Sequence, residues 1–357
     1  MNILVDCSKL LVPHNGTWRV TIEVIRALRT RHGVTLAFPH QFDNTTLPKD
    51  LHDLPRIYGT HKRNLGSLQQ IWWEVMRVPL MSGNYDMVVA PYYSLSGGWG
   101  TDNIMISVLD IWPLRSKNRG KARLRSGLLR WSLTHASHIM TISVFSQKEI
   151  YAVSKRKADV VLLGTDIPQP ADTPFEHRRN QILYVGGYDA RKQVGFLIDA
   201  LMNVQDYLPS DWALALVGNV PQDIQIGLSS FRDHVRYVGN VDDNSLSQLY
   251  RESRVFAYPS MYEGFGLPPL EAMAHGTPPV VRDVASLREV VQTAGIVVGE
   301  NDYEAFGNAM AGLLLDANLW REYHTRCQAR ANELTWELMH ERMNELVYRR
   351  SSTYRQH

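Results

Sequence analysis

Residues 260–281 read SMYEGFGLPPLEAMAHGTPPVV, a stretch that combines a loop, a helix and the start of a strand. The double proline suits the first turn of a helix, because the N–H groups of that turn have no partner within the helix. We therefore predict a helix that begins near Pro268 and ends at Gly276, where an extended segment follows. This loop, helix and strand are one unit of a longer alternation.

Extended apolar runs alternate with amphipathic stretches along the chain. The first half predicts buried strands at NILVD, VTLAF, DMVVA, NIMISVLD and HIMTIS, and helices at residues 18–31, 67–80, 121–135 and 145–155. A second series predicts strands at QILYVGG, WALALVG, HVRYVG, RVFAYPS, TPPVVR and GIVVG, and helices at residues 191–204, 243–251, 268–275 and 303–315. Such alternation indicates α/β architecture with parallel sheets, and the restart indicates two Rossmann-like domains.

The length of 357 residues also suits two domains rather than one core. Because residues 164–180 are polar and contain prolines, we predict one domain over residues 1–165 and a second over residues 166–335. Residues 336–357 are predicted to form a helix that packs back on the first domain. Two sheets that face across a cleft would line it with the carboxyl ends of strands, where ligands of open α/β sheets bind.

The composition, 44% hydrophobic and 21% charged, is that of a soluble globular protein. No apolar run approaches the roughly 18 residues of a membrane span, and the first residues lack the features of a signal peptide, so we expect a cytoplasmic protein. Cys7 and Cys327 have neither metal-ligand spacing nor the pattern of a disulfide framework. Residues 1–165 contain 21 Lys and Arg against 11 Asp and Glu, and the remainder contains 17 against 25, which indicates different partners for the two halves.

An anion site is predicted in the loop before the helix of residues 268–275. The positive end of the helix dipole and the loop amides favour an anion. Those amides belong to Gly264, Phe265, Gly266 and Leu267. Glu263 lies in this loop and Glu271 in the first turn of the predicted helix. A first-turn acid can also interact with the helix dipole alone. The two glutamates by themselves therefore do not establish a ligand site, and the rest of the chain must supply further evidence.

Two other segments of the second half add to this prediction. Arg191 and Lys192 begin a predicted helix after the strand that ends at Gly187, and two cations there could neutralise a diphosphate. Gly239 and Val241 follow another strand, where backbone groups could read the edge of a base. The alternatives are solvated charges at a helix start and an ordinary turn.

In this order, the motifs resemble the donor domain of the retaining glycosyltransferases of the GT-B fold, glycosyltransferase family 4. The motifs are strand-Gly-Gly-x-x-x-Arg-Lys, strand-Gly-x-Val and Glu-Gly-Phe-Gly-Leu-Pro-x-Leu-Glu. The resemblance covers nearly the whole chain and is strongest to bacterial mannosyltransferase-like members that build surface polysaccharides such as O-antigen. It implies that Glu271 holds the ribose hydroxyls of a nucleotide-sugar and that Glu263 lies close to the transferred sugar. Arg191, Lys192 and the amides of residues 265–267 would neutralise the diphosphate.

The resemblance further implies transfer with retention of configuration and without an enzymatic nucleophile. The departing diphosphate takes the proton of the acceptor on the same face of the sugar, so stabilising that diphosphate is the main electrostatic task. No metal is expected to take part, because the arrangement supplies its own positive charge.

The first half departs from the family pattern at two places. In HNGTWRV, residues 14–20, Gly16 fits the Thr-Gly-x-Gly-Arg-like loop of the family, but Trp18 stands in place of its second glycine. Trp18 could stack on an acceptor sugar or pack the start of a helix. Leu109 replaces the family histidine that approaches the reacting sugar, whereas Asp110 after it remains a candidate catalytic residue. In TISVFSQKEI, the two serines are predicted to cap a helix.

Residues 115–135 form a basic stretch whose predicted helix could settle on an anionic membrane or beside the phosphates of a lipid-linked acceptor. Its expected apolar face consists of Leu124, Leu128 and Trp131, flanked by Lys121, Arg123, Arg125 and Arg130. The alternative is a helix that packs on its sheet with solvated charges. Trp72 and Trp73 could serve an acceptor or belong to the core. Nucleic acid is not an expected partner, because no recognised binding module is present.

The resulting hypothesis is a retaining glycosyltransferase that moves a hexose from a nucleotide-sugar to a saccharide or a lipid-linked saccharide during polysaccharide biosynthesis. The resemblance favours GDP-mannose as donor and leaves UDP-hexoses and N-acetylhexosamines open. We expect the protein in the cytoplasm, with the inner face of the plasma membrane as a further partner. The alternatives are a nucleotide-sugar epimerase of the GT-B fold and a non-catalytic donor-binding subunit. A dehydrogenase is disfavoured, because no Gly-x-Gly-x-x-Gly follows the first strand.

Overall fold

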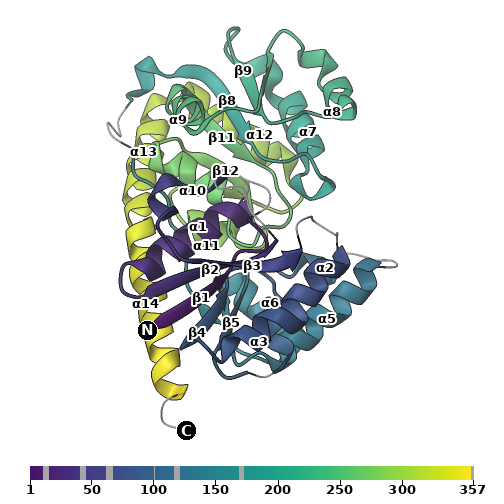
Figure 1. Ribbon diagram of the computed structural model, residues 1–357. Helices are drawn as coiled ribbons and strands as arrows, with labels where there is room; N and C mark the ends of the chain where they lie inside the picture. Colours follow the sequence, from purple (N-terminus) through teal and green to yellow (C-terminus); the bar gives the residue numbers. More distant parts are fainter. Residues whose placement is uncertain are drawn as a thin grey trace. The chain divides into compact units, whose positions relative to one another are not determined.

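Parallel β-sheets with helices on their faces organise the computed structural model (Figure 1), which describes residues 1–10, 16–40, 46–61, 67–99, 101–115, 121–168 and 173–354. The chain divides into two units. Unit 1 comprises residues 1–163 and 336–357, and unit 2 comprises residues 164–335. The α/β prediction is confirmed, since each unit is built on one sheet in which the described strand pairs are parallel.

The sheet of unit 1 has the strand order β3-β2-β1-β4-β5-β6-β7 among the described residues. Its strands are β1 Asn2–Asp6, β2 Gly33–His40, β3 Arg56–His61, β4 Met87–Ala90, β5 Ile104–Val108, β6 His138–Thr141 and β7 Asp159–Val160. All residues of β4 and β5 are buried, as expected of central strands that are covered on both faces. The five predicted strands are present, and the edge strands β3 and β7 were not predicted.

The helices of unit 1 include one π-helical segment, η3, between two short α-helices. The elements are α1 Gly16–Arg29, η2 Lys49–Leu51, α2 Ser67–Trp72, η3 Trp73–Arg77, α3 Val78–Ser82, η4 Ser96–Trp99, α4 Trp112–Arg115, α5 Lys121–His135, α6 Val144–Ser154 and α14 Trp336–Tyr354. Ser143 caps α6, as predicted, because its side chain accepts a hydrogen bond from the amide of Ser146 at 3.0 Å. The hydroxyl of Ser146 instead donates to the carbonyl of Leu109 at 3.1 Å.

Helix α14, yellow in Figure 1, packs against α1 within unit 1. The Nε2 atom of His340 lies 2.9 Å from a carboxylate oxygen of the buried Glu23, and the Nδ2 atom of Asn344 donates to the carbonyl of Ala27 at 2.8 Å. These bonds join residues more than three hundred positions apart in the sequence. Unit 1 is therefore built from both ends of the described chain.

Unit 2 has the strand order β10-β9-β8-β11-β12-β13. Its strands are β8 Arg179–Val185, β9 Ala213–Val217, β10 Val235–Gly239, β11 Ser253–Tyr258, β12 Pro279–Arg282 and β13 Ile296–Val298, and its α-helices are α7 Val194–Val204, α8 Gln222–Gly227, α9 Asp243–Glu252, α10 Leu267–Ala274, α11 Leu287–Val291, α12 Tyr303–Leu315 and α13 Ala317–Asn332. All six predicted strands are present. The direction of strand addition reverses between β8 and β11, which is the switch point where open α/β sheets bind ligands.

Helix α10 begins at Leu267, one residue before the predicted start. Gly266 precedes it with φ of 107°, a conformation open to glycine, and Gly276 follows it with φ of 67°. The placement of Glu271 in the first turn was therefore wrong. It is the fifth helical residue and is buried, so it is not an exposed acid that interacts only with the helix dipole. Within the described ranges, no helix is both long and apolar enough to traverse a bilayer.

Candidate functional site

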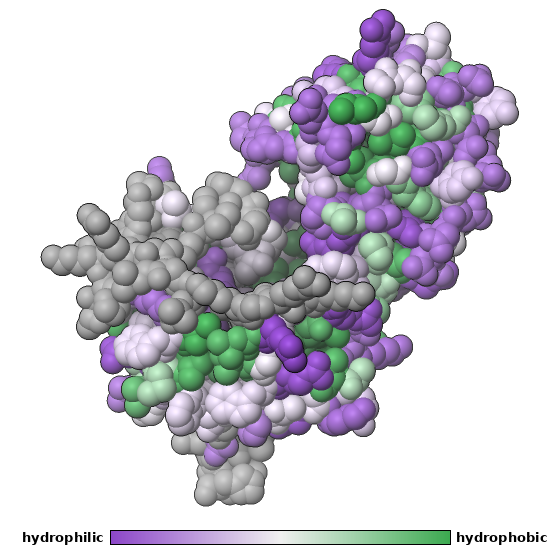
Figure 2. Space-filling model, turned by 90° about the vertical axis from the view of Figure 1, so that its right-hand side faces the viewer, coloured by the Kyte–Doolittle hydropathy of each residue, from purple (hydrophilic) through white to green (hydrophobic). Residues whose placement is uncertain are grey.

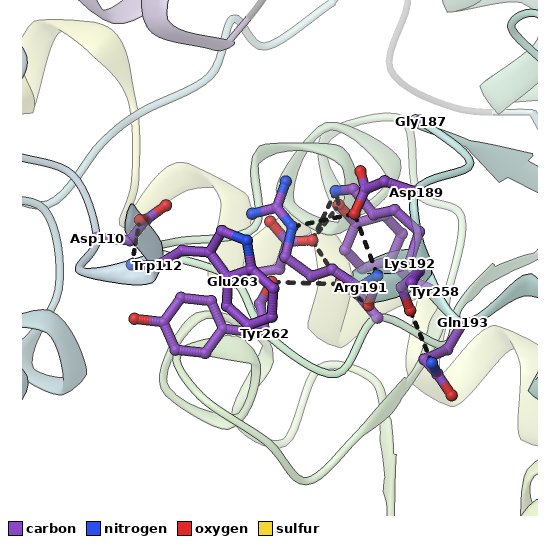
Figure 3. Close-up of polar contacts among 12 residues, drawn as sticks. Asp110, Trp112, Gly187, Asp189, Arg191, Lys192, Gln193, Tyr258, Tyr262 and Glu263 are labelled. Carbon is purple, nitrogen blue, oxygen red and sulfur yellow. Dashed lines mark hydrogen bonds and ion pairs between the residues drawn. The ribbon is translucent and has the colours of Figure 1, made fainter. Parts of the chain in front are cut away.

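The candidate site lies in unit 2, where β8 and β11 end side by side. After β8 the chain passes through Gly187 into the short turn η6, Ala190–Lys192, and after β11 it enters the loop that carries Glu263. The amide of Met261 donates to the carbonyl of Arg191 at 2.9 Å, which fastens the second loop to the first. Side chains from both strand ends thus meet at the switch point of the sheet (Figure 3).

Glu263 and Lys192 form a buried ion pair. One carboxylate oxygen of Glu263, Oε1, lies 2.6 Å from the Nζ atom of Lys192, and each residue is only 8% exposed. Two charges this deep are tolerated only when they are paired and hydrogen-bonded. The alternative that Lys192 is a solvated charge at a helix start is therefore wrong.

Two hydroxyl groups complete the environment of the same oxygen. Tyr258 donates to Glu263 Oε1 at 3.0 Å and accepts from Lys192 at 2.8 Å, while Ser260 donates to Oε1 at 2.6 Å. Burial and the neighbouring carboxylate raise the pKa of Tyr258 well above its ordinary value, so its hydroxyl stays protonated and remains a donor. Among the described residues, no hydrogen bond reaches the other oxygen, Oε2. That oxygen can accept a hydrogen bond from a ligand hydroxyl.

Arg191 also has a carboxylate beside it. Its Nε atom lies 3.5 Å from Oδ1 of Asp189, and the same oxygen accepts the backbone amide of Arg191 at 3.1 Å. The two cations and their two carboxylates therefore balance to zero formal charge. The sequence predicted two cations available for a diphosphate, whereas in the structure each cation lies beside a carboxylate, Lys192 beside Glu263 and Arg191 beside Asp189.

Ser286 stabilises the conformation of the loop before α10. The hydroxyl of Ser286 lies 2.9 Å from the carbonyl of Glu263 and 2.8 Å from the carbonyl of Phe265. Pro268 and Pro269 have no N–H groups, so the donors at the start of α10 are limited to Leu267 and the preceding loop. The amides that can form the predicted anion site are therefore those of Leu267 and the loop residues just before it.

Glu271 has a tyrosine partner of its own. Tyr250, from α9, donates to Oε2 of Glu271 at 3.0 Å and stacks on the ring of His275 at 5.1 Å between centroids. His275 faces the carbonyl of Glu271 with Nδ1 at 2.7 Å and the hydroxyl of Ser247 with Nε2 at 2.8 Å. Because a carbonyl only accepts, Nδ1 carries a proton, and in the neutral ring Nε2 accepts from Ser247.

Tyr250, Tyr258 and Ser260 were not predicted as site residues. Tyr258 ends an apolar strand and resembles a core residue in the sequence. The available signal was its position, because the last residue of a central parallel strand lies at the edge where ligands bind.

Gly239 and Val241 lie at the end of β10 and, within the described chain, outside the hydrogen-bonded cluster around Glu263. Gly239 has φ of 74°, and its carbonyl accepts the amide of Gly218 at 2.8 Å. The hydrogen bond forms an isolated bridge between the residues at the ends of β9 and β10. A contact of Gly239 or Val241 with a base remains a prediction.

The candidates in unit 1 have local structural contacts. Oδ1 of Asp110 accepts from the hydroxyl of Tyr93 at 3.1 Å and from the amide of Trp112 at 2.9 Å, so Asp110 holds the start of α4. Gly16 is the first residue of α1, and apart from its chain neighbours no atom of the described residues lies within 4 Å of the position that a Cβ would take. Trp18 is half-buried on the same helix. The remainder of the predicted loop, residues 11–15, lies outside the described residues.

No metal centre is evident in the part of the chain that the structure describes. Three or more His, Cys, Asp or Glu side chains do not come together there in a way that could hold an ion. Cys7 and Cys327 are buried thiols, and burial raises the pKa of both.

Comparison with known proteins gives matches in sequence. Residues 179–316 match the family model for "Glycosyl transferases group 1". The chain is 35% identical to O-antigen chain mannosyltransferase B of Escherichia coli, over 61% of this chain and 62% of that protein, which is less than two thirds of its length. It is 24% identical to O-antigen chain mannosyltransferase RfbU of Salmonella typhimurium, over 87% of this chain and 90% of that protein.

Solved structures match the whole chain. Sucrose-phosphate synthase from Thermosynechococcus elongatus superposes with a TM-score of 0.77 at 21% identity, over 99% of this chain and 100% of that one. HepE of Anabaena, in complex with UDP and glucose, superposes with a TM-score of 0.76 at 20% identity, over 98% of this chain and 99% of that one. At these identities the likeness establishes a shared fold.

Proposed function

We propose that this chain, in which unit 2 is a group 1 glycosyltransferase domain and the whole has the GT-B fold, is a retaining mannosyltransferase. The resemblance inferred from the motifs is confirmed at the level of family and fold. The proposed donor is GDP-mannose, and the proposed acceptor is a saccharide or lipid-linked saccharide of a surface polysaccharide at an anionic membrane. Mannose is favoured because the relatives are named as mannosyltransferases. The epimerase and the non-catalytic subunit are not favoured.

The observation that carries the proposal is the buried cluster of Glu263, Lys192, Tyr258 and Ser260 at the switch point of unit 2. Three donors fix one oxygen of Glu263, so the orientation of its other oxygen is fixed as well. A carboxylate held in this way is a strong and directional acceptor for a sugar hydroxyl, especially where water is excluded. Glu271, buried beside Tyr250, would accept from the ribose in the same manner.

The proposed reaction breaks the bond between the anomeric carbon and the diphosphate oxygen, and forms a bond between that carbon and an acceptor oxygen on the same face. The acceptor proton passes to the departing phosphate. Negative charge therefore grows on the diphosphate, where Arg191, Lys192 and the loop amides can meet it. As this charge grows, Lys192 moves from Glu263 toward the phosphate. Lys192 therefore stabilises the transition state more than it stabilises the free enzyme.

Replacing Glu271 with glutamine is expected to weaken nucleotide binding roughly 10- to 100-fold, because a hydrogen bond to a charged acceptor contributes about 1.5–3 kcal/mol. Isothermal titration with GDP, UDP and ADP measures this and identifies the preferred nucleotide. The matched control is Glu304→Gln, since Glu304 is an exposed acid in the first turn of α12. Equal, small changes in both variants would count against the proposed role of Glu271, and no binding to the wild type would count against the proposed function.

Chelation by EDTA is expected to leave turnover of GDP-mannose unchanged, because Arg191, Lys192 and backbone amides are proposed to supply the positive charge. Release of GDP, followed with and without EDTA, measures the effect. A loss of activity that added Mg²⁺ restores would contradict this part of the proposal.

A further inference from the structure

Arg178 is a charged residue inside unit 2. Hydrophilic side chains cover much of the face of unit 2 that Figure 2 shows, whereas Arg178 is only 3% exposed. It lies between the short helical turn η5, Phe175–His177, and the start of β8. A guanidinium this deep is tolerated only when its N–H groups are hydrogen-bonded. The oxygens that accept from Arg178 therefore show which parts of the unit it holds together.

The guanidinium of Arg178 joins segments that are far apart in the sequence. It donates to oxygens before β8, at the end of α9 and in the loop after α10. These acceptors are the carbonyls of Thr173 at 2.8 Å, Tyr250 at 3.3 Å, Ser253 at 2.8 Å and His275 at 2.7 Å, and the hydroxyl of Thr277 at 2.7 Å. The rigid planar fork of arginine fixes its acceptors relative to one another, which the flexible stem of lysine does not. Arg178 thus fixes the end of α9 relative to the end of α10.

Two of these carbonyls belong to the residues whose side chains contact Glu271. The hydroxyl of Tyr250 donates to Oε2 of Glu271 at 3.0 Å, and Nδ1 of His275 lies 2.7 Å from the carbonyl of Glu271. Thr277 strengthens the connection, because its hydroxyl donates to the carbonyl of Tyr250 at 2.6 Å and accepts from Arg178. Tyr250 and Glu271 lie on different helices. Their hydrogen bond therefore depends on the backbone positions that Arg178 holds.

Helix α13 holds the same loop through an aromatic contact. The ring of Trp320 on α13 lies 4.8 Å from the guanidinium carbon of Arg178 and stacks on the ring of His324 at 4.6 Å between centroids. Nδ1 of His324 lies 2.7 Å from the carbonyl of Gly276, in the loop after α10. Stacking on an aromatic ring uses the flat face of the guanidinium, which is a second reason why lysine is not equivalent here.

We propose that Arg178 is a positioning residue for nucleotide binding. It holds Tyr250 and His275, and these two residues hold the carboxylate of Glu271 in the orientation that accepts the ribose hydroxyls of the nucleotide-sugar. This inference rests on the proposed function, which assigns the ribose to Glu271. The competing explanation is that Arg178 stabilises unit 2 as a whole, without a specific effect on the ribose contact.

The test compares two probes, GDP and 2′,3′-dideoxyGDP, which lacks both ribose hydroxyls. The wild type is expected to bind GDP roughly 10- to 100-fold more tightly than the dideoxy probe, because the carboxylate of Glu271 is a charged acceptor. Arg178→Lys is expected to reduce this ratio of affinities at least about threefold, as for coupled residues of one hydrogen-bond network. A general loss of stability would weaken the binding of both probes equally and leave the ratio unchanged. Isothermal titration measures both dissociation constants.

The matched control is Arg282→Lys. Arg282 is 4% exposed, lies 4.5 Å from the ring of Phe196 and donates to the carbonyl of Pro259 at 3.1 Å. It resembles Arg178 in its burial, in its aromatic contact and in its bond to a carbonyl, but it holds a different loop. Arg282→Lys is therefore expected to lower the melting temperature of the protein, as Arg178→Lys does, and to keep the wild-type ratio of affinities.

An unchanged ratio in Arg178→Lys, or an equal reduction in Arg282→Lys, would overturn the inference. If Arg178→Lys does not fold, Thr277→Val takes its place, because valine keeps the shape of the side chain and removes one oxygen that Arg178 holds. A reduced ratio in Thr277→Val would then support the inference, and the wild-type ratio would overturn it.

The same titrations separate this inference from the proposed function. Absence of GDP binding by the wild type would defeat the proposed function and, with it, this inference. Equal affinity of the wild type for the two probes would defeat the role of Glu271 and the inference that depends on it. Discrimination by the wild type with an unchanged ratio in Arg178→Lys would defeat this inference alone.

Discussion

Glu263→Gln is expected to lower the turnover of the sugar donor roughly 100- to 1000-fold, while nucleotide affinity in the folded protein changes little. The range is of the order found when one preorganised hydrogen-bonding group is removed from an active site. Oε1 of Glu263 holds Lys192, Tyr258 and Ser260 together, and Oε2 is the acceptor that the cluster leaves for a hydroxyl. An amide would carry no charge and would present donors where the cluster requires an acceptor. Nucleotide release from GDP-mannose measures turnover, and titration with GDP measures affinity.

Stability provides the control for this variant. Loss of the Glu263 carboxylate leaves Lys192 buried without its counter-charge. In comparable buried ion pairs this lowers the free energy of unfolding by about 3–5 kcal/mol. Lys192→Met, Glu263→Gln removes both charges and is expected to regain most of the lost melting temperature without regaining turnover. Turnover that returns together with stability would show that Glu263 acts only through the fold. Tyr258→Phe keeps both charges and removes one hydrogen bond, so its turnover and its melting temperature should lie between those of the wild type and Glu263→Gln.

Gly266→Val is expected to weaken nucleotide binding roughly 100-fold or more, because the substitution combines backbone strain with a steric clash. At φ of 107° a β-branched residue is strained by about 1–3 kcal/mol. A Cβ atom there would also lie 2.9 Å from a methyl group of Leu287, inside the closest normal contact. The loop must change conformation to relieve the backbone strain, and its amides are the proposed anion donors. Titration with GDP measures the effect.

The matched control for this variant is Gly83→Val. Gly83 follows α3 with φ of −63°, and apart from its chain neighbours nothing in the described part of the chain lies within 4 Å of the position that a Cβ would take. This variant should bind GDP like the wild type. Equal affinity of Gly266→Val and the wild type would mean that residues 264–267 do not contact the nucleotide.

The fold could be predicted from the sequence wherever a strand is buried on both faces. Such strands appear as apolar runs, and all eleven predicted runs became strands. The strand β3, RIYGTH, was missed because, among the described strands, it lies at the edge of its sheet beside β2. Its described side chains are therefore partly exposed and form no apolar run. Only two residues make up β7, which is too short for a pattern.

The sequence predicted which residues belong to the site but not which of them pair with one another. Motif spacing identified Glu263, Glu271, Arg191 and Lys192, yet Lys192 and Glu263 are 71 positions apart, and no local pattern encodes that they meet. For the same reason the sequence treated Arg191 and Lys192 as a net positive pair. The neutral cluster emerges only when the ends of β8 and β11 are brought side by side.

The packing of α14 on α1 also determines the order in which the two units can be completed. Unit 2 is continuous in sequence, whereas the bond between Glu23 and His340 in unit 1 spans 317 positions. During synthesis, unit 2 has all of its residues before unit 1 has its last helix. Because contacts between distant residues form late, the amino-terminal unit is expected to finish folding after the unit that follows it. Until then, the surface of α1 that receives α14, including the carboxylate of Glu23, stays uncovered on the nascent chain.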